Sequence, residues 1–355
     1  MANPGKLKGR GTGSRVDPRY LAHTREGVDD GWHCEEDPGR VTTTVTVEHP
    51  RTIISRNRSP DVPFEVSVNP YRGCEHGCIY CYARPTHAYL DLSPGIDFES
   101  RLFAKPDAPD LLRRELGKPG YRCTPLAMGT NTDPYQPIER RWEITRRVLE
   151  VLSEARHPLS IVTKASLVER DIDILAPMAE RGLVQIYLSV TSLDNDLARR
   201  LEPRAAAPAR RLETLARLHG AGIPVGVMFA PVIPFINDAD MEAVLEQAVA
   251  AGAESAGYVM LRLPHEIKQL FRDWLKAHAP DRETHVMNVI SDLRGGREND
   301  PRFHSRMRGT GHYADLIRQR FQHACRRLGL NRKHRELDTT LFIPPGAEGV
   351  QQTLF

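Results

Sequence analysis

Between residues 65 and 280, short apolar runs alternate with amphipathic stretches, and this alternation limits the folds that the chain can adopt. The apolar runs predict six strands, at 65–68, 125–129, 159–163, 184–190, 225–233 and 256–261. The amphipathic stretches predict six helices, at 110–117, 139–156, 171–181, 208–219, 238–251 and 265–278. Six βα units in succession predict an α/β fold with a parallel sheet, which right-handed crossovers curl toward a full or partial barrel. In such folds the chemistry lies at the carboxyl ends of the strands.

The segments on either side of this core differ from it in composition. Residues 1–60 are rich in Gly, Pro and charged residues, so we expect a flexible N-terminal extension with one short strand at 42–47. A core domain is predicted at 61–280. It is followed by a C-terminal appendage at 281–355, with a helix at 313–328 and a flexible tail.

Positive charge is concentrated near the C-terminus. The 355 residues carry a net charge of only +3, but residues 290–340 hold 12 Lys and Arg against 6 Asp and Glu. This basic segment is either a solvated helical face or a surface that faces phosphate groups. The overall charge therefore neither requires nor excludes nucleic acid as a partner.

Composition also bears on where the protein works. No run approaches the roughly 20 apolar residues of a membrane helix, and the start MANPGKLKGRGTGSR has no apolar segment typical of a secretory signal. Six cysteines in 355 residues are too few for a disulfide scaffold. We therefore expect a cytoplasmic protein with reduced thiols and no membrane partner.

Three of the six cysteines, Cys74, Cys78 and Cys81, lie within eight residues directly after the first predicted strand. Thiols at this CxxxCxxC spacing can converge on one metal centre, and thiolates suit zinc or iron–sulfur clusters. A structural zinc site usually takes two CxxC-like pairs. No second pair exists, although His76 or His87 could supply a fourth ligand. Three cysteines on a four-iron cluster leave one iron open to a chelating ligand, so the spacing favours catalysis over structure.

The cysteine spacing, its place after the first strand of a six-fold βα series and the aromatic Tyr80 resemble the radical S-adenosylmethionine (SAM) superfamily. The resemblance implies a partial (βα)₆ radical SAM barrel that carries a [4Fe–4S] cluster on Cys74, Cys78 and Cys81. It implies that SAM binds the open iron. It also implies that one electron, from a flavodoxin- or ferredoxin-type reductant, cleaves SAM to methionine and a 5′-deoxyadenosyl radical.

The same resemblance implies SAM contacts at the ends of later strands. The segment Gly129-Thr130-Asn131-Thr132-Asp133 stands in the place of the family's Gly-Gly-Glu segment, which contacts the SAM amino group. Lys164 stands where the SAM carboxylate would lie, and Ser189 or Thr191 could bond the ribose. The candidate cofactor-binding residues are Tyr80, Gly129, Thr130, Asn131, Lys164 and Ser189.

A narrower resemblance is to the spore photoproduct lyase group, often described as DNA repair photolyase-like. It is carried by NPYRGCEHGCIYCYARPTHAYL, TNTDPYQPIE and LEPRAAAPARRLETLARL, and is strongest to the subset of unknown substrate. Those lyases have a hydrogen-donating cysteine at the end of the second strand. The chain has Met128-Gly129-Thr130 there, and Cys123 lies at the other end of the strand. The resemblance therefore implies lyase-like radical chemistry without the same hydrogen return.

Five arginines cluster around the LEPR sequence after the fourth predicted strand: Arg199, Arg200, Arg204, Arg210 and Arg211. An arginine-rich loop on the active face suits an anionic substrate such as nucleic-acid phosphate. Alternatively, Asp196, Glu202 and Glu213 pair with some of these arginines. We take Arg199, Arg200 and Arg204 as candidate substrate contacts.

The last five residues are similar to the peptide Gln-x-x-Leu-Phe that binds the bacterial sliding clamp. Gln351 and the apolar pair Leu354-Phe355 would supply the anchors, and a frayed tail is the alternative. For the whole chain, the main prediction is a radical SAM enzyme that acts on nucleic acid. The alternatives are radical chemistry on a protein or small molecule, and a non-catalytic metal-binding module.

Overall fold

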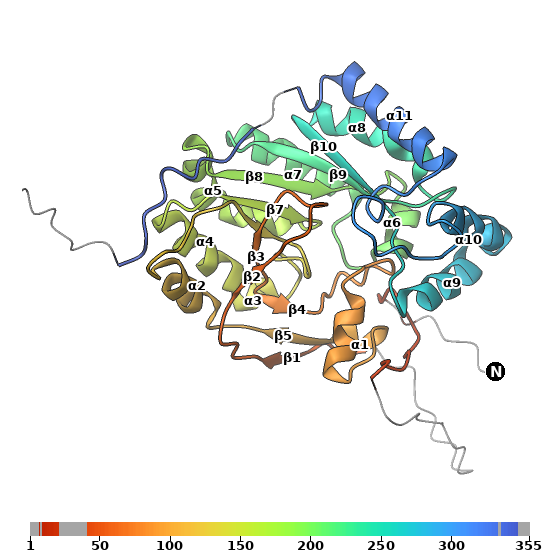
Figure 1. Cartoon of the computed structure of the whole chain (residues 1–355), viewed down its shortest axis with the longest axis horizontal. Helices are drawn as coiled ribbons and strands as arrows, with labels where there is room; N and C mark the ends of the chain where they lie inside the picture. The colour runs from red at the N-terminus through yellow and green to blue at the C-terminus, as the bar shows by residue number, and fades with distance from the viewer. Residues whose placement is uncertain (1–6, 8, 21–40, 333–334, 347–355) are drawn as a thin grey trace, which may run out of the picture.

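A seven-stranded sheet forms the centre of the computed structural model, which describes residues 7, 9–20, 41–332 and 335–346 (Figure 1). Its strands lie in the order β10-β9-β8-β7-β6-β3-β2. Six are parallel: β3 (Val66–Val68), β6 (Leu126–Met128), β7 (Leu159–Thr163), β8 (Val184–Ser189), β9 (Val225–Val232) and β10 (Ser255–Met260). β2 (Ile54–Arg56) adds an antiparallel edge. The predicted α/β fold is therefore confirmed. Among the described strands, β10 and β2 remain unpaired on their outer edges, as in a partial barrel.

Helices cover the sheet because their apolar stripes and the strands share one core. Buried aliphatic residues of the strands, such as Ile161 and Ile186, pack in the same cluster as Leu149, Leu152 and Leu215 of the helices. The predicted helices correspond to α2 (Ala108–Leu116), α4 (Ile144–Glu154), α5 (Ile172–Glu180), α7 (Pro208–Gly220), α8 (Met241–Ala250) and α9 (Ile267–His278). The sequence reading missed α6 (Asn195–Leu201) and α10 (Glu283–Asp292).

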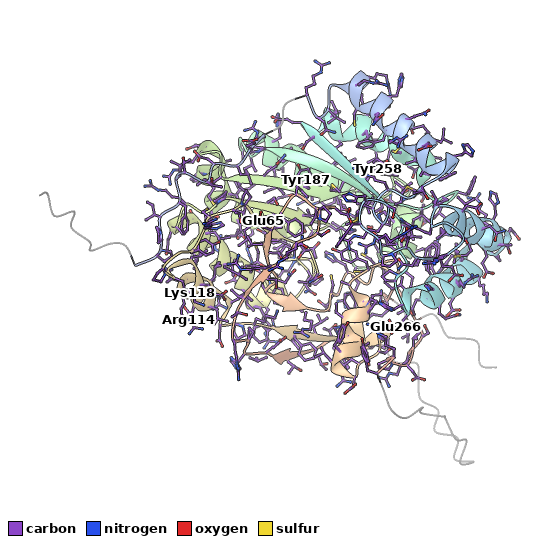
Figure 2. All side chains as sticks on the ribbon, viewed as in Figure 1. Glu65, Arg114, Lys118, Tyr187, Tyr258 and Glu266 are labelled. Atoms are coloured by element: carbon purple, nitrogen blue, oxygen red, sulfur yellow. The ribbon has the colours of Figure 1, made fainter. Side chains whose placement is uncertain are left out.

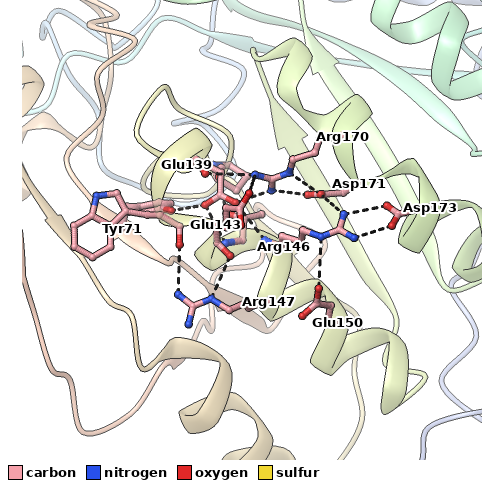
Figure 3. A network of polar contacts seen from close by, with 12 residues as sticks. Tyr71, Glu139, Glu143, Arg146, Arg147, Glu150, Arg170, Asp171 and Asp173 are labelled. Atoms are coloured by element: carbon pink, nitrogen blue, oxygen red, sulfur yellow. Dashed lines mark hydrogen bonds and ion pairs between the residues drawn. The ribbon is translucent and has the colours of Figure 1, made fainter.

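The single helix predicted at 139–156 is wrong, because the chain breaks it into α3 (Glu139–Trp142) and α4. Glu143 at the break has φ +48, a left-handed conformation that ends the first helix. The break turns Glu139 into the interior, where it accepts hydrogen bonds from Arg170 (2.7 Å), the Thr145 amide (3.0 Å) and the Tyr71 hydroxyl (Figure 3). Helical periodicity cannot reveal this tertiary network.

The described part of the N-terminal extension packs against the core. Arg10 donates to the Glu99 carbonyl (2.6 Å), and Arg19 pairs with Glu266 at the start of α9 (3.0 Å; Figure 2). The extension contributes two strands instead of one, β2 and β1 (Thr44–Val47). β1 joins β5 (Arg101–Ala104) and β4 (Tyr71–Arg72) in a small second sheet.

Much of the basic C-terminal segment is neutralised by glutamates. Helix α11 (His312–Leu328) lies along α8 (Figure 1), and the ring of Tyr258 on β10 lies 4.7 Å from that of Phe321 (Figure 2). Ion pairs from this segment to glutamates of the core include Arg320–Glu242 (2.6 Å), Arg327–Glu246 (2.5 Å) and Arg335–Glu254 (3.2 Å). These contacts favour the structural interpretation for that part of the segment.

Two further expectations concern the clamp-binding peptide at the C-terminus and membrane-spanning helices. Gln351, Leu354 and Phe355 lie outside the described residues, so the clamp-binding peptide stays a prediction. None of the described helices combines the length and the apolar character that a membrane crossing needs.

A buried arginine holds the loop that carries the three cysteines. Arg84, the first residue of the 3₁₀ helix η1 (Arg84–Leu90), is fully buried and forms an ion pair with Glu99 of α1 (Ile96–Ser100; 2.5 Å). Its guanidinium also donates to the carbonyls of Gly77 (3.0 Å), Cys78 (2.8 Å), Pro94 (3.2 Å) and Gly95 (2.9 Å). Glu99 in turn accepts the Gly11 amide (2.8 Å). One group therefore joins the cysteine loop, α1 and the N-terminal extension.

Replacing this arginine should destabilise the protein strongly. Arg84→Met leaves Glu99 charged, buried and unpaired, so we expect a loss of about 3–5 kcal/mol in the free energy of unfolding. Arg113→Met is the matched control, because the Arg113–Glu154 pair is about half exposed and should cost about 0–1 kcal/mol. Urea unfolding of the full chain measures both. Equal losses in the two variants would contradict a central role for Arg84.

Candidate functional site

The cysteine loop runs from Gly73 to Cys81, after β4 and before η1. Cys74 and Cys78 are buried, Cys81 is half-buried, and none of the three is in a disulfide. The Cys74 amide donates to the Phe98 carbonyl (3.0 Å), which ties the loop to α1. Gly77 has φ +67, and a β-carbon there would lie 2.7 Å from a Glu99 carboxylate oxygen, so the tight loop requires glycine.

The three thiols fit a soft metal centre. Burial raises the pKa of Cys78 to about 12 and that of Cys74 well above its usual value, and the three sulfurs influence one another electrostatically. Thiols in this environment become thiolate ligands only when a metal supplies compensating positive charge. Among the described residues, no three His, Cys, Asp or Glu side chains are arranged to hold a single metal ion. In a four-iron cluster each cysteine would bind a different iron. The cysteine sulfurs around such a cluster therefore lie further apart than cysteine sulfurs that bind a single metal ion.

The two histidines considered as zinc ligands make other contacts. His76 Nδ1 lies 3.4 Å from an Asp133 carboxylate oxygen, while His87 Nε2 lies 3.0 Å from the Arg101 carbonyl. The His87 ring packs edge-on against Phe98, and burial lowers its pKa to about 4. Neither contact supports zinc ligation by these histidines.

The segment after β6 turns tightly beside the cysteine loop. Gly129 has φ +91, and a β-carbon there would lie 2.0 Å from the Val162 carbonyl, so no side chain fits. The Asn69 side chain bonds both the Thr130 hydroxyl (3.1 Å) and the Asn131 amide (3.0 Å). These contacts place all three predicted residues, 129 to 131, at the carboxyl end of the sheet.

Asp133 is a positioning residue that was not among the six candidate cofactor-binding residues. Its carboxylate accepts hydrogen bonds from the Thr163 hydroxyl (2.7 Å) and the Lys164 amide (2.8 Å). Burial alone would raise the pKa of Asp133, but His76 and these hydrogen bonds hold it at about 2. The sequence feature that could have indicated this role is a short acidic side chain just after a predicted strand. Such a side chain can join the end of β6 to the end of β7.

Lys164, Ser189 and Tyr80 meet at the ends of β7 and β8. The Lys164 ammonium donates to the Ser189 hydroxyl (3.0 Å) and lies 5.8 Å from the centre of the Tyr80 ring. Lys164 is also close enough to Cys78 to favour its thiolate. The structure therefore brings these three predicted residues together next to the cysteine loop.

A buried carboxylate, Glu202, contacts this group through Tyr80. It accepts hydrogen bonds from the Tyr80 hydroxyl, the Thr191 hydroxyl (2.9 Å) and the guanidinium of Arg211. Burial disfavours its charge, but Arg211 and Lys164 outweigh burial and lower the pKa of Glu202. Thr191 is thus engaged with Glu202, whereas Ser189 faces Lys164.

The arginines around the LEPR sequence have different surroundings. Arg204 pairs with Glu75 of the cysteine loop (2.9 Å), and Arg210 pairs with Glu169 (2.6 Å). Arg199 and Arg200 are exposed on α6, and Arg200 lines a pocket together with Trp274 and Arg282. Among the three candidate substrate contacts, Arg204 therefore already has a carboxylate partner.

The site as a whole combines three free thiols, one half-buried ammonium and several hydroxyl and amide donors at one end of a parallel sheet. Soft thiolates can hold an iron–sulfur cluster, and an ammonium beside them can bind the carboxylate of a ligand on that cluster.

Relatives identified by sequence carry no assigned activity. An uncharacterised protein of Mycobacterium tuberculosis is 38% identical over 222 residues, which cover 62% of this chain and 65% of that protein. An uncharacterised protein of Methanocaldococcus jannaschii is 29% identical over 175 residues, which cover 49% of this chain and 62% of that protein. The chain thus matches less than two thirds of the length of either relative.

A solved structure and a family model indicate the fold and the family of the chain. Spore photoproduct lyase complexed with dinucleoside spore photoproduct superposes with a TM-score of 0.56 at 14% identity, over 81% of this chain and 80% of that one, which indicates a shared fold. The Radical SAM superfamily model matches residues 68–248, from the end of β3 almost to the end of α8. Since this match spans half of its length, the chain belongs to the radical SAM superfamily, whose members use a [4Fe–4S] cluster and S-adenosylmethionine.

Proposed function

We propose that this radical SAM enzyme holds its [4Fe–4S] cluster on Cys74, Cys78 and Cys81 and acts on nucleic acid. The observation that carries the cluster assignment is the set of three unbridged thiols on one loop at the carboxyl end of the parallel sheet. When bound, the cluster supplies the electron that cleaves SAM to methionine and a 5′-deoxyadenosyl radical. A one-electron reductant is the partner that this chemistry needs.

The chain's own residues would bind and orient SAM. We assign the SAM carboxylate to Lys164, because its ammonium lies near Cys78 and is already oriented by Ser189. Asp133 fixes the Lys164 backbone through a 2.8 Å hydrogen bond. We assign the SAM amino group to the tight turn of residues 129–131, where it would donate to backbone carbonyls, and the Tyr80 hydroxyl donates to Glu202.

Two points support nucleic acid as the substrate class. The fold is shared with a lyase that binds a dinucleoside photoproduct, and the candidate substrate contacts Arg199 and Arg200 are exposed on α6. Residues 128–130 carry no thiol at the end of β6, so we do not extend the hydrogen return of that lyase to this chain. Radical chemistry on a protein or small molecule is the competing proposal, and a metal-binding module without catalysis is the other.

Replacing the cysteines tests the proposal directly. After anaerobic reconstitution and reduction by dithionite, the wild-type chain should convert SAM to 5′-deoxyadenosine. Cys74→Ala, Cys78→Ala and Cys81→Ala should each lose most of the bound iron and all of this product, because three ligands are needed to hold the cluster. Cys123→Ala and Cys325→Ala should retain the bound iron and the formation of 5′-deoxyadenosine. Iron analysis and product chromatography measure these two quantities. Cluster-loaded wild-type protein that neither binds nor cleaves SAM would leave only the metal-binding alternative.

Replacing Lys164 tests the assignment of the SAM carboxylate. Lys164→Met removes one charge-assisted hydrogen bond, so SAM should bind the cluster-loaded protein about tenfold or more weakly. Lys118→Met is the matched control because Lys118 is exposed on the surface near α2 (Figure 2). Equilibrium dialysis with labelled SAM measures the affinity, and the iron content should stay unchanged in both variants. Equal SAM affinity in the two variants would refute the role of Lys164.

A further inference from the structure

The end of β10 is surrounded by arginines that each donate to at least one oxygen acceptor. Arg294 donates to the carbonyls of Leu261 (2.6 Å) and Arg306 (2.8 Å). Arg306 pairs with Asp61 (2.5 Å), and Arg308 donates to the Tyr258 carbonyl (3.0 Å). These three side chains fasten the segment 302–308 to the edge of the sheet, and each has an oxygen acceptor.

Arg262, two residues after β10, differs from them. It is half-buried, its Nε is buried without a hydrogen-bond partner, and its Nη1 reaches only the sulfur of Met307 (3.8 Å). No carboxylate among the described residues pairs with it. Burial and the neighbouring Arg306 both lower the pKa of Arg262, and nearby Asp61 is engaged by Arg306. A guanidinium that has lost water without gaining an oxygen acceptor is poised to bind an anion.

The position of Arg262 connects it with the cysteine loop. Its guanidinium carbon lies 5.5 Å from the centre of the Tyr82 ring, and Tyr82 directly follows Cys81. The Tyr82 hydroxyl donates to the Thr130 carbonyl at the end of β6. Arg262 therefore faces the carboxyl end of the sheet, on the side where the proposed radical would form.

The ring of Tyr82 indicates which kind of anion fits here. Tyr82 is 47% exposed although it lies beside the cysteine loop, so part of this residue is accessible to a ligand. An aromatic face next to an arginine fork suits a nucleotide, because the base can stack while the guanidinium bonds two phosphate oxygens. A free carboxylate would use the arginine but not the ring.

We infer that Arg262 binds a phosphodiester group of the substrate, with the adjoining base against Tyr82. This inference rests on the proposed function, since it names the part of a nucleic-acid substrate that the site recognises. Arg262 is then a specificity-determining residue. It acts on substrate binding, while Lys164 and the cysteines serve SAM and the cluster.

Binding of a short single-stranded oligodeoxynucleotide to the cluster-loaded full chain tests this inference. Arg262→Gln should weaken binding about ten- to a hundredfold, as expected for a lost hydrogen-bonded charge. It should also reduce the salt-dependence slope by about 0.7. The exposed Arg297→Gln removes the same charge from the surface of the C-terminal appendage and should change affinity by about twofold or less. A methylphosphonate oligonucleotide, which lacks backbone charge, should not distinguish wild type from Arg262→Gln.

Two parallel measurements separate this inference from the proposed function. Arg262→Gln should bind SAM and form 5′-deoxyadenosine as the wild type does. If SAM affinity falls instead, Arg262 holds the cofactor carboxylate and the inference is overturned. If the variant binds the oligonucleotide as tightly as the wild type, the inference is also overturned, while radical formation stands. Absence of 5′-deoxyadenosine from the wild type would refute the proposed function independently of oligonucleotide binding.

Discussion

The buried ion pair between Arg84 and Glu99 is the interaction on which the site depends. The cysteine loop is too irregular to satisfy its own carbonyls, and an unpaired buried carbonyl is costly. The Arg84 guanidinium donates hydrogen bonds to the carbonyls of Gly77 and Cys78. Its ion-pair partner Glu99 accepts a hydrogen bond from the Gly11 amide. The loop is thus anchored through its backbone carbonyls.

Two further buried carboxylates organise the ends of the strands. Asp133 joins β6 to β7, and Glu202 gathers Tyr80 and Arg211 below the loop. Lys164 lies between them, so its ammonium has opposite charges nearby without a direct carboxylate partner among the described residues. This arrangement stabilises a half-buried cation while leaving it able to bind an incoming carboxylate.

The C-terminal segment completes the open side of the sheet. The Met260 amide donates to the Met307 carbonyl (2.9 Å) along the edge of β10, and Arg306 bonds Asp61 in the loop between β2 and β3. The appendage therefore joins the two edge regions that strand pairing leaves apart. In doing so it places Met307 and Arg306 beside Arg262, which has no oxygen acceptor among the described residues.

The sequence by itself determined the βα order, the six parallel strands and the cysteine triplet, because apolar periodicity and ligand spacing are local properties of the chain. It also identified Lys164 and Ser189, since polar residues at strand ends must lie at one edge of a parallel sheet. Only the tertiary structure decided the break at Glu143, the packing of the N-terminal extension and the isolation of Arg262. Each of these depends on partners distant in the sequence, whose contacts outweigh the local preference of the backbone or side chain.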